Sequence, residues 1–465
     1  MHDIYVKDII KKCNGKLIVG NENIILDNFS KDTRTINNND IYIGIKGEVF
    51  DGNNLYKEAL ENGALGCILD DTTNIDIDYL KKYQDRFIIV VKDTIKCIQT
   101  LAIYKRNLYD IPVIGITGSV GKTSTKDIVT SVLSKKYKVL STIGNYNNHI
   151  GVPLTILRLK DEECMVIEMG MNNLGEISKL SEIAKPTVSI ITNVGTAHIG
   201  NLGSRENILK AKLEILNGMN KDGILIINND NDLLHNYYLE NGNTKNIVTF
   251  GIDNDSNYMA NNIKRDTLSS TYNVLINDNI YNFKINIPGD HFVLNSLCAI
   301  SIGNLFNIDV SLIKEGIENF ILTKRRMEIE KIKDITIIND SYNANLDSMN
   351  SAINYLGSLN NRKIAVIGDM LELGKFSGEL HRKVADTLLK NNIDIVITVG
   401  ELSKYIKDEL NKNNYYNIFS YDNNIDAFNK LKEIIKRNDN VLFKASNSMK
   451  FNEIYNYLID YLNTM

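Results

Sequence analysis

The feature that most constrains this chain is a glycine-rich stretch between an apolar segment and a helical pattern. Residues 112–117 are predicted to form a buried strand, and residues 122–136 a helix. Glycines in that position let the backbone turn its N–H groups toward one oxyanion, and the following helix adds partial positive charge. We therefore expect nucleotide phosphates to bind at Thr117, Gly118, Ser119, Val120, Gly121, Lys122 and Thr123.

Two side chains of this stretch carry the expected chemistry. Lys122 can neutralise β- and γ-phosphate oxygens, and the Thr123 hydroxyl can hold Mg²⁺. The strict pattern G-x-x-x-x-G-K-[ST] is not met, because its first glycine would fall on Ile116. The alternative is a glycine-rich turn with a solvated lysine, but the order of strand, loop, Lys-Thr and helix favours the phosphate loop.

The length and the pattern of elements predict three α/β domains. The chain has 465 residues, and roughly 100–200 residues per domain are typical. Residues 1–108 have the pattern of a small α/β unit, and residues 109–322 that of a mostly parallel sheet with antiparallel strands near residues 258–287. Residues 323–465 read as a second, Rossmann-like doubly wound unit.

Composition excludes several classes of protein. With 53 basic and 57 acidic residues the net charge is −4, so no chain-wide basic surface for nucleic acid is expected. No run of eighteen apolar residues predicts a membrane-spanning helix, and the N-terminus has no secretory pattern. The five cysteines are scattered without a Cys-x-x-Cys pair, which is typical of reduced thiols in a cytoplasmic protein.

Three further polar residues follow the phosphate loop in an order that suggests a common site. Glu168 ends the predicted strand 164–168, and His198 follows the predicted strand 187–193. Both would lie on the carboxyl edge of a parallel sheet, where ligands usually bind. Taken singly, Glu168 would be a solvated charge and His198 a structural or exposed loop residue. Lys212, on the predicted helix 204–217, would be a surface lysine.

The chain resembles the Mur ligases of bacterial cell-wall synthesis over all three domains. The resemblance rests on many ordered motifs rather than on the phosphate loop alone. These are DTR at 32–34, KGEVFDG at 46–52, residues 115–127, GNYNNHIGVPLT at 144–155, EMGM at 168–171, residues 192–198, KAK at 210–212, GDHFVLN at 289–295, DSYNAN at 340–345 and GDMLELG at 368–374.

The resemblance implies an ATP-dependent amide ligase. The last three motifs point to the member of the family that adds D-alanyl-D-alanine to UDP-N-acetylmuramoyl-tripeptide during peptidoglycan precursor synthesis. In this family ATP phosphorylates the carboxylate that ends the peptide, the incoming amine attacks the acyl phosphate, and ADP and phosphate leave. Two Mg²⁺ ions are implied, the first held by Thr123 and Glu168 and the second by His198. Lys212 matches the family lysine that becomes carbamylated, and the carbamate would be an anionic metal ligand.

The resemblance also assigns binding roles. Asn295 matches the asparagine that binds adenine, while Asp340 and Asn343 would lie on the ribose and adenine side. Arg326 would close the C-terminal domain onto ATP, although it is also one member of a basic turn. Residues 1–108 would bind the UDP-sugar and residues 323–465 the incoming dipeptide. The UDP-sugar is expected at Thr33, Arg34 and Lys46, and the sugar and peptide at Asn145, Asn147 and Asn148.

Two departures from the family pattern leave alternatives open. Leu346 stands where a proline usually follows DSYNAN, and Asn447 ends a Lys-Ala-Ser-Asn stretch where Lys-Gly-Ser-Arg is usual. The lost arginine puts recognition of the dipeptide carboxylate in question. The alternatives are the family member that adds the third, diamino acid residue, and a nucleotide-dependent binding protein without catalysis. We expect a monomer without nucleic-acid or membrane partners.

Overall fold

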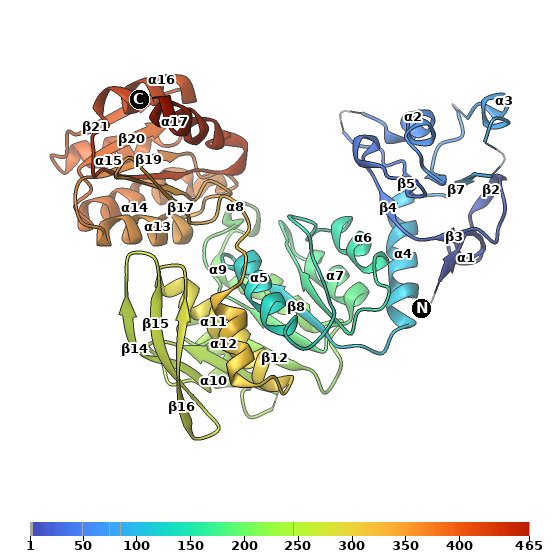
Figure 1. The fold of residues 1–465 in the computed structure, drawn as a ribbon, viewed down its shortest axis with the longest axis horizontal. Helices are drawn as coiled ribbons and strands as arrows, with labels where there is room; N and C mark the ends of the chain where they lie inside the picture. The colour runs from blue at the N-terminus through green and yellow to red at the C-terminus, as the bar shows by residue number, and fades with distance from the viewer. Residues whose placement is uncertain (1–2, 49, 74, 84, 245, 465) are drawn as a thin grey trace.

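The computed structural model describes residues 3–48, 50–73, 75–83, 85–244 and 246–464. Figure 1 shows three units, with the N-terminal unit in blue and the C-terminal unit in red on either side of the central one. Each unit contains its own sheet covered by helices, so the α/β class predicted from the sequence is confirmed. All five cysteines are unpaired thiols.

The N-terminal unit is built on a five-stranded sheet in the order β2-β7-β6-β5-β4, with β2 antiparallel to β7 and the other pairs parallel. A separate pair, β1 and β3, is antiparallel. The strands are β1 (Ile4–Tyr5), β2 (Lys16–Val19), β3 (Ile25–Leu26), β4 (Phe29–Ser30), β5 (Ile41–Ile43), β6 (Gly66–Leu69) and β7 (Phe87–Val90). The helices are α1 (Val6–Cys13), α2 (Tyr56–Glu61), α3 (Ile77–Leu80) and α4 (Thr94–Asn107).

The central unit has a nine-stranded sheet in the order β16-β15-β14-β13-β12-β11-β8-β10-β9. It is parallel from β9 to β14, and β15 and β16 extend it as antiparallel strands. The strands are β8 (Val113–Thr117), β9 (Val139–Ser141), β10 (Cys164–Glu168), β11 (Val188–Ile191), β12 (Ile224–Asn228), β13 (Ile247–Gly251), β14 (Tyr258–Arg265), β15 (Ser270–Ile276) and β16 (Asn279–Ile285). The helices are α5 (Lys122–Leu133), α6 (Gly151–Leu157), α7 (Glu176–Ala184), α8 (Ile199–Leu202), α9 (Arg205–Leu213), α10 (Asp232–Asn241), α11 (Asp290–Leu305) and α12 (Val310–Glu318).

The C-terminal unit has a six-stranded sheet in the order β17-β18-β22-β19-β20-β21, parallel except for the edge strand β17. The strands are β17 (Glu328–Ile332), β18 (Ile335–Asn339), β19 (Lys363–Gly368), β20 (Ile395–Val399), β21 (Ile418–Tyr421) and β22 (Asn440–Lys444). The helices are α13 (Leu346–Ser358), α14 (Ser377–Lys390), α15 (Lys404–Lys412), α16 (Asn424–Ile434) and α17 (Asn452–Thr464).

Several inner strands of the central and C-terminal sheets are buried along their whole length. Every residue of β8, β10 and β22 is buried, as expected where helices cover both faces of a parallel sheet. The loops at the carboxyl ends of β8, β10 and β11 therefore emerge at one edge of the central sheet. The ends of β18 and β22 meet in the same way in the C-terminal unit.

Leu346 shows why the missing proline is tolerated. It is the first residue of α13, directly after Asn345, whose side chain accepts a hydrogen bond from the Ser348 N–H. Proline suits this first helical position because the N–H there has no partner within the helix. Leucine fits the same place, since the Asn345 cap already starts the helix.

Within the described residues, no helix is both long and apolar enough to cross a membrane.

Candidate active site

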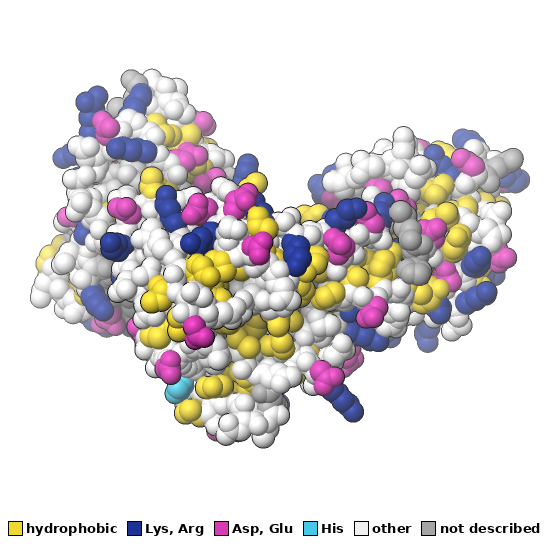
Figure 2. All heavy atoms as spheres, turned by 60° about the horizontal axis from the view of Figure 1, so that its bottom comes forward, with side chains coloured by type: hydrophobic (Ala, Val, Ile, Leu, Met, Phe, Trp, Pro, Cys, Tyr) yellow, Lys and Arg dark blue, Asp and Glu magenta, His cyan; other side chains and the backbone are white. Residues whose placement is uncertain are grey.

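A cavity of about 440 Å³ lies where the loops of the central unit meet those of the C-terminal unit. The space-filling view shows the notch between the two outer units (Figure 2). The phosphate loop, the end of β10 and the loop after β11 line the cavity from the central unit. Asp340, residues 342–345, residues 371–373, Lys444 and Asn447 line it from the C-terminal unit. The cavity is therefore shared between two units.

The phosphate loop is held in shape by its neighbours. Lys122 Nζ donates a hydrogen bond to the Gly118 carbonyl at 2.7 Å, so the lysine curls back over its own loop. Asn193 Oδ1 accepts hydrogen bonds from the N–H groups of Ser119 and Val120, at 3.0 and 2.9 Å. Asn193 was not among the predicted site residues, although it lies within the motif at residues 192–198.

Lys122 and Lys212, the two lysines predicted for the site, lie in a poorly solvated environment. Burial lowers the pKa of Lys122, while the nearby Glu168 carboxylate opposes that shift. Lys212 is only 1% exposed, so the surface position expected from its sequence alone is wrong. Burial, and then the charge of Lys122, hold the pKa of Lys212 well below its usual value. No described carboxylate forms an ion pair with Lys212, and its neutral amine is therefore favoured.

Glu168 carries a buried oxygen that the protein leaves without a partner. Its side chain is 2% exposed, and Oε1 accepts a hydrogen bond from Asn147 Nδ2 at 2.7 Å. Oε2 has no hydrogen-bond partner among the described residues. Because a buried carboxylate oxygen is costly to leave unmatched, this atom indicates a site for a cation.

Asn295 shows the same pattern. Its side chain is 6% exposed, and its Nδ2 has no partner among the described residues. A Cβ atom at Gly121 would lie 2.9 Å from Asn295 Oδ1, so the amide sits directly against the phosphate loop. A buried amide with a free donor at this place suits a ligand that offers an acceptor, as a nucleobase does.

Arg326 of the C-terminal unit reaches the phosphate loop. Its Nη2 donates a hydrogen bond to Thr123 Oγ1 at 3.1 Å, and its guanidinium lies 4.0 Å from the centroid of the Tyr342 ring. The Arg326 Nε has no hydrogen-bond partner among the described residues. The arginine is thus fixed by stacking, with donors available at the phosphate site.

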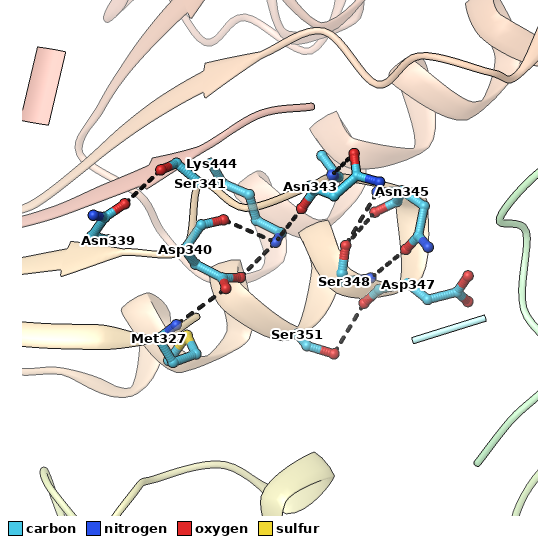
Figure 3. Close-up of polar contacts among 11 residues, drawn as sticks. Met327, Asn339, Asp340, Ser341, Asn343, Asn345, Asp347, Ser348, Ser351 and Lys444 are labelled. Carbon is cyan, nitrogen blue, oxygen red and sulfur yellow. Dashed lines mark hydrogen bonds and ion pairs between the residues drawn. The ribbon is translucent and has the colours of Figure 1, made fainter. Parts of the chain in front are cut away.

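Asp340 is clamped from two sides (Figure 3). Its Oδ1 accepts a hydrogen bond from the Met327 N–H at 3.1 Å, and its Oδ2 lies 2.5 Å from Lys444 Nζ. Lys444 Nζ also donates to the Asn343 carbonyl at 3.2 Å. Burial lowers the pKa of Lys444, and the Asp340 carboxylate opposes that effect. Lys444 was not predicted as a site residue, although it is the first residue of the Lys-Ala-Ser-Asn stretch that ends at Asn447.

His198 is paired across the boundary between the two units. Its Nδ1 lies 2.7 Å from Glu372 Oε2, and this contact lowers the pKa of Glu372. Both residues have left-handed backbone, with φ of 61° and 65°. Such conformations are unusual outside glycine and concentrate at functional sites. Glu372 lies in the GDMLELG motif, but sequence alone gave no reason to pair it with His198.

A second polar contact joins the same two units. Asp347, in the first turn of α13, accepts hydrogen bonds from the N–H and the hydroxyl of Thr196 at 2.8 and 2.9 Å. Two carboxylates of the C-terminal unit therefore contact the loop between β11 and α8. Asp347 contacts Thr196, and Glu372 contacts His198. Asp347 was not predicted, because nothing in its local pattern distinguishes it from a helix-start acid.

The predicted UDP-sugar residues of the N-terminal unit do not line this cavity. Thr33 donates to Glu58 Oε1 at 2.8 Å, and Lys46 is exposed. The Arg34 side chain donates two hydrogen bonds to Asp32, at 2.9 and 2.7 Å, and these lower the pKa of Asp32 to about 2. The structure therefore places these three residues on the N-terminal unit, outside the described lining of the cavity.

The three asparagines predicted for sugar and peptide do line the cavity. Asn147 is tied to Glu168, as described above. Asn148 Oδ1 accepts hydrogen bonds from the N–H groups of Ile150 and Gly151, so part of its role is to start α6. Asn145 is exposed at the rim.

The described residues contain no group of three or more His, Cys, Asp or Glu side chains that could hold a metal ion alone. Magnesium does not need such a group, since it is commonly held by one or two protein ligands together with substrate phosphates and water. The free oxygen of Glu168 and the hydroxyl of Thr123 are of the type that magnesium prefers.

Comparison with known proteins agrees with this arrangement. A family model described as the Mur ligase middle domain matches residues 116–303, and one described as the Mur ligase glutamate ligase domain matches residues 325–447. The UDP-N-acetylmuramoyl-tripeptide–D-alanyl-D-alanine ligase of Bacillus subtilis (strain 168) is 36% identical over 461 residues, covering 98% of each chain. The ligase of the same name from Escherichia coli (strain K12) is 32% identical, over 82% of this chain and 83% of its own.

Solved structures give the same result. MurF from Acinetobacter baumannii superposes with a TM-score of 0.87 at 26% identity, covering 99% of both chains. The MurF ligase of Thermotoga maritima, solved in complex with ADP, has a TM-score of 0.81 at 27% identity and covers 94% of this chain and 98% of its own. With matched models over two of its three units, and relatives that span nearly its whole length, the chain belongs to the Mur ligase family.

Proposed function

We propose that this chain joins D-alanyl-D-alanine to UDP-N-acetylmuramoyl-tripeptide, with conversion of ATP to ADP and phosphate. The relatives named above carry this activity in their names. The observation that carries the proposal is the approach of Arg326 to Thr123, which brings a C-terminal cation to the central phosphate loop. The chain is then an ATP-dependent amide ligase whose site is completed by two units.

The main chemical obstacle is charge, because an anionic carboxylate must approach the anionic γ-phosphate. Lys122 would release the Gly118 carbonyl and turn its ammonium to the transferring phosphoryl oxygens. Arg326 would add its guanidinium from the other side, with its plane already fixed on Tyr342. The contact of the two units would also keep water from the acyl phosphate, whose hydrolysis would waste ATP.

Magnesium, when bound with ATP, would screen the same repulsion. Thr123 and Glu168 would hold the first ion, since Glu168 has an oxygen without a partner and the Thr123 hydroxyl lies at the start of α5 beside the phosphate loop. His198 would serve a second ion only after its Nδ1 leaves Glu372 or through its other nitrogen. Asn295 would bind the adenine, and Asp340 and Asn343 would lie on the ribose and adenine side. The Met327 N–H and Lys444 would orient the Asp340 carboxylate.

We further propose that Lys212 is carbamylated. Its neutral amine is the form that reacts, because the nitrogen lone pair attacks the carbon of CO₂. The new N–C bond forms as one C=O electron pair moves to oxygen, and the nitrogen releases one proton to water. The product is an anion, which suits a metal site better than a second ammonium beside Lys122. ¹³C-bicarbonate should give a carbamate NMR signal in the wild type that is absent in Lys212→Ala.

The three units would divide the substrates between them. We propose that residues 1–108 bind the UDP-sugar through Thr33, Arg34 and Lys46, with Asn145, Asn147 and Asn148 facing the sugar and peptide. Residues 109–322 would bind ATP, and residues 323–465 the dipeptide. We propose that the protein acts as a cytoplasmic monomer, and light scattering would test the oligomeric state.

The decisive experiment measures ADP and phosphate formed from ATP and Mg²⁺ with UDP-N-acetylmuramoyl-tripeptide, with and without D-alanyl-D-alanine. We expect phosphate release that requires both substrates, and a pentapeptide product by mass spectrometry. Turnover of the dipeptide-linked precursor with a diamino acid would instead identify the family member that adds the third residue. Nucleotide binding without phosphate release under every condition would favour a binding protein.

A further inference from the structure

The incoming dipeptide carries a carboxylate that the reaction leaves intact, so its site needs a cation that is not engaged with the nucleotide. Arginine matches a carboxylate best, because its guanidinium offers two parallel N–H donors. Among the described residues, the lysine and arginine side chains that line the cavity are Lys122, Arg326 and Lys444.

Each of these three cations is already tied to the proposed nucleotide side. Lys122 bonds to the phosphate loop, Arg326 bonds to Thr123, and Lys444 forms an ion pair with Asp340. Using any of them for the dipeptide would remove a positive charge from the phosphates or leave Asp340 unpaired. The carboxylate is therefore better matched by a cation at the rim of the cavity.

Arg325 is such a cation. Its Nη2 donates a hydrogen bond to Asn447 Oδ1 at 2.6 Å, and Asn447 lines the cavity. No described Asp or Glu forms an ion pair with the Arg325 side chain. Its φ is 63°, a left-handed conformation that is uncommon for arginine, and the Tyr342 N–H donates to its carbonyl at 3.1 Å. The backbone thus holds this side chain at the rim despite local strain.

The spacing of the two neighbouring arginines suits a dipeptide. Their guanidinium carbons lie 5.5 and 4.0 Å from the centroid of the Tyr342 ring, for Arg325 and Arg326 respectively, so they are at most 9.5 Å apart. Two extended residues span about 7 Å. One dipeptide could therefore place its amine at the phosphate site beside Arg326 and its carboxylate at Arg325.

An apolar surface for the two methyl side chains lies beside this cation. Leu371 lines the cavity and is 36% exposed. Its N–H donates to Ser446 Oγ at 2.9 Å, which ties the Leu371 loop to the turn that carries Asn447. Methyl groups gain from contact with such a side chain because apolar surface leaves water.

We propose that Arg325, positioned by Asn447, binds the carboxylate of the incoming dipeptide. The inference rests on the proposed function, and it explains how the chain recognises a carboxylate although Asn447 itself carries no charge. Arg325 is then a substrate-binding residue that determines which amine the enzyme accepts.

The first test compares Arg325→Gln with Lys324→Gln, which removes the same charge from the adjacent exposed position. Steady-state phosphate release gives the KM of each substrate. We expect the KM for D-alanyl-D-alanine to rise roughly 10- to 100-fold in Arg325→Gln, the usual effect of losing a charge-assisted hydrogen bond. The KM for ATP should stay unchanged, and Lys324→Gln should behave as the wild type.

The second test uses D-alanyl-D-alaninamide, which lacks the carboxylate. The wild type should prefer the free dipeptide, whereas Arg325→Gln should treat the two amines nearly alike. Adding Asn447→Arg to Arg325→Gln should restore the preference, because Asn447 lies beside the same position. A recovered preference also excludes misfolding as the cause of the loss.

Two results would overturn the inference in different ways. If Arg325→Gln kept the wild-type preference for the carboxylate, this inference would fail while the proposed function stood. If the wild type released phosphate without any need for the dipeptide, both would fail together.

Discussion

The two outer units are attached to the central unit in different ways. Three charged residues of the C-terminal unit contact loops of the phosphate site, and all three contacts depend on charge. These residues are Arg326, Asp347 and Glu372. The N-terminal unit is joined mainly by α4, which packs against α6 and α7 with the apolar residues Ile98 and Leu101 buried, and its ion pair with the central unit, Asp27–Lys160, is solvent-exposed. Among the described residues, none that lines the cavity comes from the N-terminal unit.

The two kinds of attachment suit two different tasks, which are holding a substrate in place and assembling the phosphate site. Apolar packing is non-directional and insensitive to ligands, so it suits a unit that keeps a long substrate in a fixed place. Charged contacts respond to the phosphates and cations that bind between them, so they suit a unit whose docking assembles the site. Substitutions in the C-terminal contacts should therefore change kcat, and those in the N-terminal unit should change KM.

The largest effect is expected from Arg326→Ala. Loss of this guanidinium removes a positive charge at the phosphoryl group, and kcat should fall roughly 100- to 1000-fold, as for other preorganised donors. Steady-state phosphate release would measure it, with the exposed Arg437→Ala as control. A kcat within threefold of the wild type would mean that the contact with Thr123 has no part in turnover.

Asp347→Ala should have a smaller effect of the same kind. It removes both hydrogen bonds to Thr196, so the docked arrangement should be less populated and kcat should fall about tenfold. Asp386→Ala, an exposed acid of α14, is the matched control. An altered KM for the UDP-sugar substrate with normal kcat would contradict the division of tasks.

Arg34→Ala tests the other side of the comparison. Because this arginine is exposed and lies outside the cavity, we expect the KM for the UDP-sugar substrate to rise several-fold, up to about tenfold. The kcat should stay within about twofold. Lys81→Ala removes another exposed ion-paired cation of the same unit and should change neither value. A fall in kcat as large as that of Arg326→Ala would break the comparison.

The smallest expected effect is a loss of stability of the C-terminal unit in mild acid, and it depends on His381. His381 is buried, donates from Nδ1 to the Ser377 carbonyl at 2.7 Å and accepts at Nε2 from the Met370 N–H at 3.0 Å, so it is neutral. Burial holds its pKa below the usual 6.5. The unfolded state therefore takes up a proton first, and the stability of this unit should be full above about pH 6.5 and fall as the pH drops below it.

Hydrogen exchange at about pH 7.5 and about pH 5.5, corrected for the intrinsic rates, would measure this change. Protection should decrease around residues 368–374 more than in β5, β6 and β7, because the described part of the N-terminal unit contains no histidine. His381→Gln should remove this pH dependence. Equal loss of protection in both units would show that acid acts on the whole molecule instead.

Continuous apolar runs made much of the fold predictable. The predicted strand 164–168 coincides with β10, because it is a buried run with clear ends. The predicted helix 122–136 ends earlier, at Leu133, since residues 134–136 form a turn. Strand β17 was not predicted, because its alternating charges are typical of an exposed edge and only its pairing with β18 makes it a strand.

The site was less predictable where it depends on docking between units. The local pattern of strand, glycines and Lys122 identified the phosphate loop, because all of its parts are adjacent in the chain. The pairs His198–Glu372 and Thr196–Asp347 join residues more than 150 positions apart in different units. Sequence spacing carries no information about such contacts, and Lys212 also needed the tertiary structure to reveal its burial.

Asn193 keeps the phosphate loop in one ordered conformation throughout the catalytic cycle. Because its amide oxygen holds the Ser119 and Val120 N–H groups, the conformational entropy of ordering the loop is lost during folding and not at each encounter with ATP. Nucleotide then meets a rigid receptor, and ADP can depart without melting it. Successive turnovers would thus begin from the same preorganised loop, whichever position the outer units have reached.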